Sequence, residues 1–267
     1  MRSPIVPIVL ASAAAVTAQN ASAPGYDGYP DPIASTVAAN DSLSFGQHYA
    51  VLNLDLINGL VAPLASEPAG SAFIDNVATW IDAVHAQNPP PLSIFTRIYF
   101  NNARKPEIKP GSGFAGVSGP LTTANATATQ LYPAFHVDEA AGDVILQKTR
   151  YYAGTGNPLE EILRAQSIDT VILSGIRTSG VILSTVYRLF DLDYNVFVLR
   201  SLCILVLMIA DNCPSSYIIS NNTIETAPDT PGINAAILEG VIPKLPAQVI
   251  SIEQAIAALA NSGPAIH

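Results

Sequence analysis

The 267-residue chain has few charged residues, and those it has are mostly acidic. Asp, Glu, Lys and Arg make up 12% of the sequence, and the formal net charge is -9. The twelve basic residues are scattered, without a cluster that could follow a nucleic-acid backbone or an anionic lipid surface. The composition therefore argues against a nucleic-acid or membrane partner, and solubility alone accounts for the acidity.

Cysteine and histidine are also scarce. The two cysteines, Cys203 and Cys213, suit either one local disulfide in a secreted chain or two buried thiols, and both interpretations stay open. The four histidines show neither HxH nor HxxxH spacing (His48, His85, His136 and His267). We therefore expect no metal site, and nothing in the sequence implies a cofactor.

The N-terminus has the pattern of a processing signal. Arg2 precedes an apolar run from Ile5 to Val16, and small residues up to Ala18 offer a cleavage site. The run is too short for a permanent membrane span. We predict a signal peptide at residues 1–18 and a secreted, extracellular protein. Residues 19–45, rich in Ala, Ser, Pro, Gly and Asp, are expected to form a mobile leader before one domain at residues 46–262.

Four sequons fit a secreted glycoprotein. The predicted glycosylation sites are Asn20, Asn40, Asn125 and Asn221.

From Tyr49 onward, strand-like and helix-like segments alternate, which is typical of a parallel α/β sheet. The predicted strands are Tyr49–Leu54, Leu92–Phe100, Val144–Gln147, Thr170–Ser174, a segment from Asn195, and Gln248–Ile250. The predicted helices are Ser71–Gln87, Asn157–Gln166, Ser179–Asp193, Ile233–Gly240, and one capped by Ser251 that ends near Asn261. In the Asn157 helix we expect Glu160 to complete a capping box.

One glycine motif lacks the context that dinucleotide binding requires. Gly111, Gly113 and Gly116 match GxGxxG, but no strand precedes them and no helix pattern follows. We interpret the motif as a flexible loop within a long irregular region, residues 101–135. A loop of that length inside a domain is usually functional or disordered.

Three features meet where a parallel sheet binds ligands, beyond the carboxyl ends of its strands. Asp55 follows the first predicted strand, Lys148 follows the third, and the turn Gly175–Val181 follows the fourth. A carboxylate and an ammonium placed close together keep each other charged in a partly dry pocket.

The same segments resemble the isochorismatase-like hydrolases, a superfamily of cysteine hydrolases. Its nucleophile turn reads roughly Gly-x-x-Thr-(Asp/Asn/Ser)-x-Cys-Val, and this chain matches it at Gly175, Thr178 and Ser179. The strand ending at Asp55 and the strand ending in Lys148 are similar to other family segments, in the same order. The resemblance runs from about Tyr49 to Leu259. It implies a Rossmann-like three-layer α/β/α fold with a mostly parallel sheet.

The resemblance also implies roles for particular residues. Asp55 would be the general acid/base, and Lys148 would hold it ionised or stabilise developing charge. Position 181 would carry the nucleophilic thiolate, and the backbone N–H groups of Arg177 and Val181 would form an oxyanion hole. A cis peptide bond is implied between Ile176 and Arg177.

Val181 departs from the family pattern, because valine has no nucleophile. Isochorismatases that lack the cysteine hydrolyse a vinyl ether by proton transfer from the Asp, usually with a smaller residue at this point. We therefore expect a thiol-free hydrolase in which Asp55 acts as general acid/base on a small C–O or C–N substrate. The alternatives are a catalytically degenerate pseudoenzyme that binds a small ligand or a protein partner, and a structural role as a homo-oligomer.

A second departure is the apolar stretch at residues 199–208, between two segments that are continuous in the family. It is interpreted as an extended strand, a hydrophobic hairpin, or retained non-coding sequence.

Overall fold

The computed structural model describes residues 43–66, 68–204, 218–220, 223–225, 233–245 and 247–266. The predicted signal peptide lies outside the described residues, as do Asn20, Asn40 and Asn221. Cys213 lies outside them too, so the two interpretations of the cysteines stay open.

The domain is built on a six-stranded parallel sheet with the strand order β3-β2-β1-β4-β5-β8. The strands are β1 (Tyr49–Leu54), β2 (Leu92–Ile98), β3 (Val144–Lys148), β4 (Thr170–Ile176), β5 (Asn195–Ile204) and β8 (Ala247–Ile250). The central strands β1 and β4 are buried along their whole length. This pattern is expected of a parallel sheet covered on both faces.

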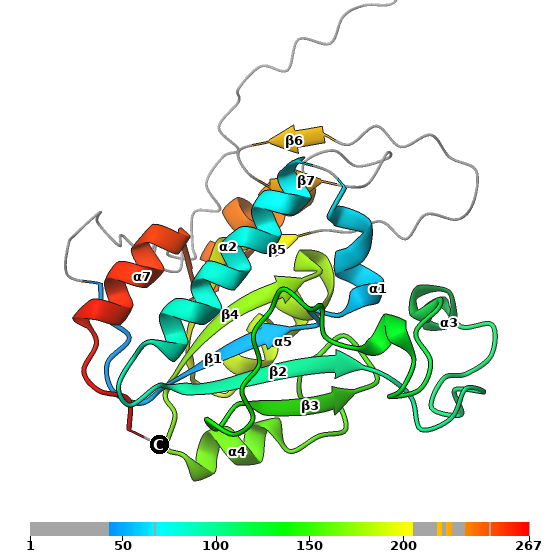
Figure 1. The fold of residues 1–267 in the computed structure, drawn as a ribbon, viewed down its shortest axis with the longest axis horizontal. Helices are drawn as coiled ribbons and strands as arrows, with labels where there is room; N and C mark the ends of the chain where they lie inside the picture. Colours follow the sequence, from blue (N-terminus) through cyan, green and yellow to red (C-terminus); the bar gives the residue numbers. More distant parts are fainter. Residues whose placement is uncertain are drawn as a thin grey trace, which may run out of the picture. The chain divides into compact units, whose positions relative to one another are not determined.

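Helices cover both faces of the sheet, which gives the predicted three layers (Figure 1). The helices α2 (Pro68–His85) and α7 (Ile252–Asn261) lie in front of the sheet in this view, and α5 (Leu183–Phe190) lies behind it. Helix α4 (Leu159–Ala165) shares the apolar core of α5, as do α6 (Ile233–Ala235) and η4 (Ala236–Val241). The predicted α/β/α fold is therefore confirmed.

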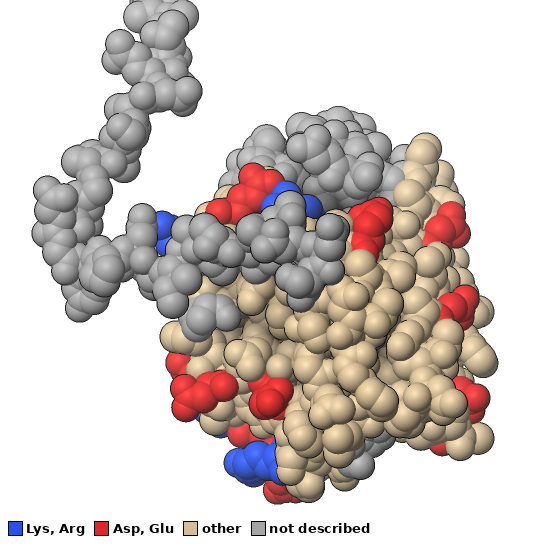
Figure 2. Space-filling model, turned by 90° about the vertical axis from the view of Figure 1, so that its left-hand side faces the viewer, with Lys and Arg blue, Asp and Glu red and all other residues tan. Residues whose placement is uncertain are grey.

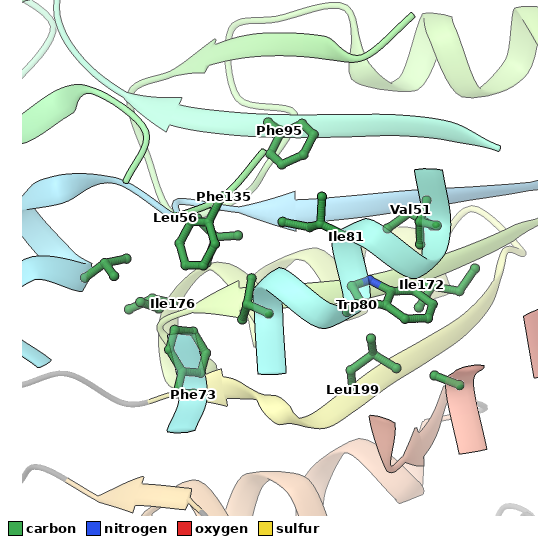
Figure 3. Close-up of a cluster of buried hydrophobic side chains, with 14 of the residues drawn as sticks. Val51, Leu56, Phe73, Trp80, Ile81, Phe95, Phe135, Ile172, Ile176 and Leu199 are labelled. Atoms are coloured by element: carbon green, nitrogen blue, oxygen red, sulfur yellow. The ribbon is translucent and has the colours of Figure 1, made fainter. Parts of the chain in front are cut away.

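Side chains of β1 alternate between two apolar cores, as the two-residue period of a strand requires. Tyr49 and Val51 join the core under α2 and α7, whereas Ala50 and Leu52 join the core under α4 and α5. Figure 3 shows the first core, where Trp80 of α2 packs among side chains of the sheet. Phe45, within the predicted leader, is also buried there.

The remaining elements are short. They are α1 (Asn58–Val61), η1 (Ala62–Leu64), α3 (Gly113–Ser118), η2 (Thr127–Thr129), η3 (Thr178–Ile182), η5 (Ile242–Lys244), and an antiparallel pair, β6 (Ile218–Ser220) and β7 (Thr223–Glu225). Strands β6 and β7 were not predicted from the sequence.

The irregular region at residues 101–135 is packed against the sheet. Arg97 of β2 donates hydrogen bonds to the backbone oxygens of Ala124 and Thr129. Ile108, Leu121 and Phe135 from this region are buried in the core. The predicted loop at the glycine motif is wrong in part, because Gly113–Ser118 form helix α3. The Ser112 side chain caps α3 by accepting a hydrogen bond from the Ala115 N–H.

The helix caps were predicted with mixed success. At α7, Ser251 and Gln254 form the reciprocal capping box that the sequence predicts. At α4, Asn157 accepts a hydrogen bond from the Leu159 N–H. The prediction that Glu160 completes a capping box is wrong. The Glu160 carboxylate accepts hydrogen bonds from Arg188 and from the Tyr152 hydroxyl instead.

The apolar stretch that begins at Leu199 continues β5. Its pairing with β4 shifts register after Leu173 and resumes between Gly175 and Cys203. The described part of the stretch, residues 199–204, is thus an extended strand, and residues 205–208 lie outside the described residues.

Acidic side chains are scattered over the face in Figure 2, with few basic ones between them. In the described part of the chain, no helix is long and apolar enough to cross a membrane.

We predict that Gly175→Ala destabilises the fold and disturbs the end of β1. Gly175 has a φ of 142°, and a Cβ there would overlap the backbone carbonyl of Leu54, next to Asp55. We expect a loss of at least about 2 kcal/mol in the free energy of unfolding, measured by urea titration. The matched control is Gly116→Ala in α3, where a Cβ meets nothing and a gain of about 0.5–1 kcal/mol is expected. Equal stability of the two variants would contradict this account.

Candidate active site

Asp55 lies at the carboxyl end of β1 and is almost fully buried, with 2% exposure. Its backbone has a φ of 58°, a left-handed conformation in which aspartate is enriched among non-glycine residues. The Thr96 hydroxyl of β2 donates a 2.7 Å hydrogen bond to Asp55 Oδ1. The Asp55 N–H in turn points at the Thr96 carbonyl and hydroxyl oxygens, at 3.2 and 3.1 Å. These contacts fix the carboxylate against the neighbouring strand.

Lys148, the last residue of β3, reaches Asp55 across the intervening strand β2. Its Nζ lies 2.6 Å from Asp55 Oδ2, and the side chain is fully buried. Nζ also donates to the backbone oxygens of Arg150 and Tyr151, at 3.0 and 2.8 Å. An ammonium has three N–H donors, so each of them has an acceptor.

Burial governs the ionisation of this pair. Loss of solvent raises the pKa of Asp55 above its ordinary value, and the nearby Lys148 and the Thr96 hydroxyl oppose that rise. Loss of solvent likewise lowers the pKa of Lys148, against the attraction of Asp55. Burial thus favours a proton on Asp55, which a general acid needs, while the contact with Lys148 favours the carboxylate.

The third part of the site is the turn between β4 and α5. The peptide bond between Ile176 and Arg177 is cis, where the resemblance implies one. Thr178–Ile182 then form a π-helical turn, and the Arg177 carbonyl accepts hydrogen bonds from the N–H groups of Gly180 and Ile182. The predicted helix Ser179–Asp193 thus begins as this turn and becomes α-helical at Leu183.

These parts enclose a small pocket of about 30 Å³. Asp55, Arg177, Val181 and Tyr151 line it together with Leu60, Ile98, Val117, Leu121 and Ile176. Val181 is 1% exposed, so its side chain fills part of the space at the position where the resemblance implies a nucleophile. The structure therefore brings together every residue that the resemblance assigned to the reaction.

Four residues that support the site were not predicted from the sequence. Thr96 binds Asp55, and the carbonyl oxygens of Arg150 and Tyr151 bind Lys148. Thr185 of α5 accepts a hydrogen bond from the Ala153 N–H, which ties the segment after Lys148 to the turn. Thr96 lies in a strand that also holds Ser93 and Arg97, so its residue type did not single it out, and backbone acceptors leave no trace in side-chain types.

Other predicted residues lie elsewhere. Asn125 is exposed in the segment before η2. His85 and His136 come together, with ring centroids 5.7 Å apart, and His85 pairs with Asp143 at 3.1 Å. No group of three or more His, Cys, Asp or Glu side chains suited to a metal ion occurs among the residues that the structure describes.

Comparison with known proteins gives a consistent result. Residues 49–204 match the isochorismatase domain family. An N-carbamoylsarcosine amidase from Arthrobacter sp is 27% identical over 147 residues, which are 54% of each chain. The present chain therefore spans about half the length of that curated relative.

Solved structures share the fold at low sequence identity. An isochorismatase family protein from Burkholderia thailandensis is similar with a TM-score of 0.60 and 21% identity, over 82% of this chain and 98% of that one. A cysteine hydrolase from Pseudomonas syringae pv. phaseolicola is similar with a TM-score of 0.62 and 15% identity, over 79% of this chain and 92% of that one. An N-carbamoylsarcosine amidase from Thermoplasma acidophilum is similar with a TM-score of 0.53 and 15% identity, over 78% of this chain and 98% of that one. With its parallel sheet, its buried Asp55–Lys148 pair and a family match over more than half its length, the chain belongs to the isochorismatase domain family.

Proposed function

We propose that this protein is a thiol-free hydrolase in which Asp55 is the general acid/base for cleavage of a small C–O or C–N substrate. The observation that carries the proposal is the Asp55 carboxyl, which lines the pocket and is held by Lys148 and Thr96 while Val181 occupies the nucleophile position. A vinyl ether of the isochorismate type suits this arrangement, because its hydrolysis needs proton transfer and no covalent intermediate.

The proposed reaction uses Asp55 twice. Protonated Asp55 gives its proton to the vinyl carbon, which leaves an oxocarbenium ion. Water then adds to that ion and returns a proton to Asp55, and the hemiketal formed breaks its C–O bond to release a ketone and an alcohol. The family match and the raised pKa of Asp55 support this sequence, since burial keeps a proton on the carboxyl at higher pH than usual.

Lys148 and the turn have supporting roles in the proposal. After proton transfer the Asp55 carboxylate is stabilised by Lys148 Nζ at 2.6 Å, in a place that water does not reach. Arg177 and Val181 both line the pocket, so for a C–N substrate their backbone N–H groups are the proposed donors to the carbonyl oxygen, which develops negative charge; the vinyl ether reaction forms no such oxyanion.

Secretion and glycosylation remain parts of the proposal. The N-terminal pattern supports an extracellular protein. The exposed Asn125 supports a sequon that is accessible to the glycosylation machinery.

A second candidate function is a pseudoenzyme that binds without turnover. The buried Val181 and the pocket of about 30 Å³ favour it, because they leave little space for a substrate at the reacting position.

The first prediction from this proposal concerns Asp55→Asn. Asparagine has the same shape but cannot transfer the proton, so we expect turnover to fall about 10²–10⁴-fold. Purified secreted protein would be offered isochorismate and a panel of small amides that includes nicotinamide. Asp75→Asn, an exposed aspartate of α2, is the matched control and should keep full activity.

Two outcomes would overturn the proposal. Wild-type protein that is folded and turns over nothing would favour the pseudoenzyme. Activity that survives in Asp55→Asn would remove Asp55 from the reaction.

The second prediction concerns the pH profile. Because protonated Asp55 is the acid, kcat/KM should fall as the pH rises through the raised pKa of Asp55. The Thr96 hydroxyl stabilises the ionised carboxylate, so Thr96→Val should raise the pKa of Asp55 further and move the falling limb to higher pH. The other ionisable groups facing the carboxyl are Lys148, Tyr151 and Arg177, which this variant leaves in place. A shift to lower pH, or an unchanged limb, would contradict the assignment.

A further inference from the structure

A second cavity lies at the opposite edge of the sheet from the candidate active site. Its volume is about 260 Å³, against about 30 Å³ for the pocket at Asp55. Leu92, the first residue of β2, and Asp143, which precedes β3, both line it, so it lies at the amino ends of two paired strands (Figure 1). Because a strand rises about 3.3 Å per residue, roughly 16 Å of β3 separates Asp143 from Lys148. We refer to this space as the distal cavity.

Two carboxylates line the distal cavity, and the surrounding chain fixes both of them. The Asp143 side chain is 5% exposed, and its two oxygens each lie 3.1 Å from Nε2 of His85, the last residue of α2. The Asp138 N–H donates a 2.8 Å hydrogen bond to Asp143 Oδ2. Asp138 Oδ1 accepts a hydrogen bond of 3.0 Å from the Ala141 N–H. A cation that enters the cavity therefore meets negative charge that is already in position, which lowers the cost of binding.

Rings form much of the remaining wall. Pro89, Pro90 and Pro91 line the cavity in succession, and the locked φ of proline keeps such a wall in one conformation. The imidazoles of His85 and His136 also line it, edge to face, with their centroids 5.7 Å apart. Proline rings are surfaces on which aromatic groups dock, and imidazole offers a further planar face. The cavity thus combines apolar and planar rings with carboxylates.

We propose that the distal cavity is a binding site for a small aromatic amine, separate from the reaction proposed at Asp55. The ammonium group would donate charge-assisted hydrogen bonds to the carboxylates of Asp138 and Asp143, and its aromatic ring would pack on the proline wall. The volume lies just below the range of about 300–1,000 Å³ that is usual for ligand pockets, so the ligand must be small.

A metal ion fits this cavity less well than an organic cation. The His and Asp side chains that line it do not form a group suited to a metal ion, which holds for every such group among the described residues. A metal ion needs several ligands that converge on one point, whereas an ammonium is bound by one or two carboxylates.

The test is the binding of three matched ligands to the full-length protein. Phenethylamine, phenethyl alcohol and phenylacetate share an aromatic ring and differ in charge, and ligand-observed NMR gives their Kd values. At about pH 8 a primary amine is protonated, whereas histidine is ordinarily neutral. We expect the amine to bind at least about tenfold more tightly than the alcohol, and phenylacetate to bind more weakly than either. If the pair of His85 and Asp143 only ties α2 to β3, no such preference is expected.

Two variants locate the binding in the distal cavity. Asp138→Asn keeps the side-chain oxygen that caps the Ala141 N–H and removes the charge, so the amine should bind about tenfold more weakly while the alcohol is unaffected. Ala141→Trp adds bulk to the wall without changing a charge, so it should abolish binding of amine and alcohol alike. The matched control is Asp75→Asn, an exposed aspartate of α2, which should bind all three ligands like wild type.

The outcomes separate this inference from the proposed function. Asp55→Asn should abolish turnover and leave the amine preference unchanged, and a preference lost in that variant would place the ligand at the active site and overturn the inference. Equal affinities for amine and alcohol in wild type, binding of neither, or a preference that survives both Asp138→Asn and Ala141→Trp would also overturn it. Thermal unfolding verifies the fold of each variant. If one of the two cavity variants does not fold, the other decides the question together with the wild-type comparison.

Discussion

The buried ion pair between Asp55 and Lys148 is the constraint on which the rest of the site depends. It joins two strands that are not neighbours, so it exists only if β1, β2 and β3 lie in their observed order. Removing both charges from water is costly, and Thr96 and two backbone carbonyls offset part of that cost. Because folding raises the pKa of Asp55, its ionisation weakens the folded state as the pH rises from the ordinary carboxyl pKa through the raised one. The pKa of Lys148 is lowered by folding. The folded state therefore gains stability as the pH rises from this lowered pKa to the ordinary pKa of lysine.

The turn after β4 lines the same pocket as Asp55. Gly175 allows β4 to pass close to Leu54, and the following residues wind into a π-helical turn that presents Arg177 and Val181 to the pocket. The fold of the family is therefore kept, with a valine at the position where the resemblance implies a nucleophilic thiol. In the proposed reaction Asp55 is the acid and Lys148 stabilises its conjugate base, a combination that suits proton transfer better than attack by a nucleophile.

Several elements could be predicted because local chemistry alone dictates them. Strand β1, with five apolar residues out of six, and the Ser251–Gln254 cap of α7 formed as their patterns indicate. Elements that depend on distant partners were missed or misjudged. Glu160 has the spacing of a capping box but binds Arg188 and Tyr152, which lie elsewhere in the sequence and approach only in the fold. Helix α3 formed in a glycine-rich segment because Ser112 caps it and Phe114 and Ala115 pack against the apolar core.

The sequence by itself determined the α/β alternation, the positions of Asp55 and Lys148 at strand ends, and the presence of valine rather than cysteine at position 181. Each of these follows from residue type and order along the chain. The tertiary structure decided which groups contact each other. Thr96 donates to Asp55, backbone carbonyls accept hydrogen bonds from Lys148, and Arg177 lines the same pocket as Asp55. These contacts depend on the order of the strands, on the placement of backbone oxygens and on burial. All three are set only when segments far apart in the sequence pack together and exclude water.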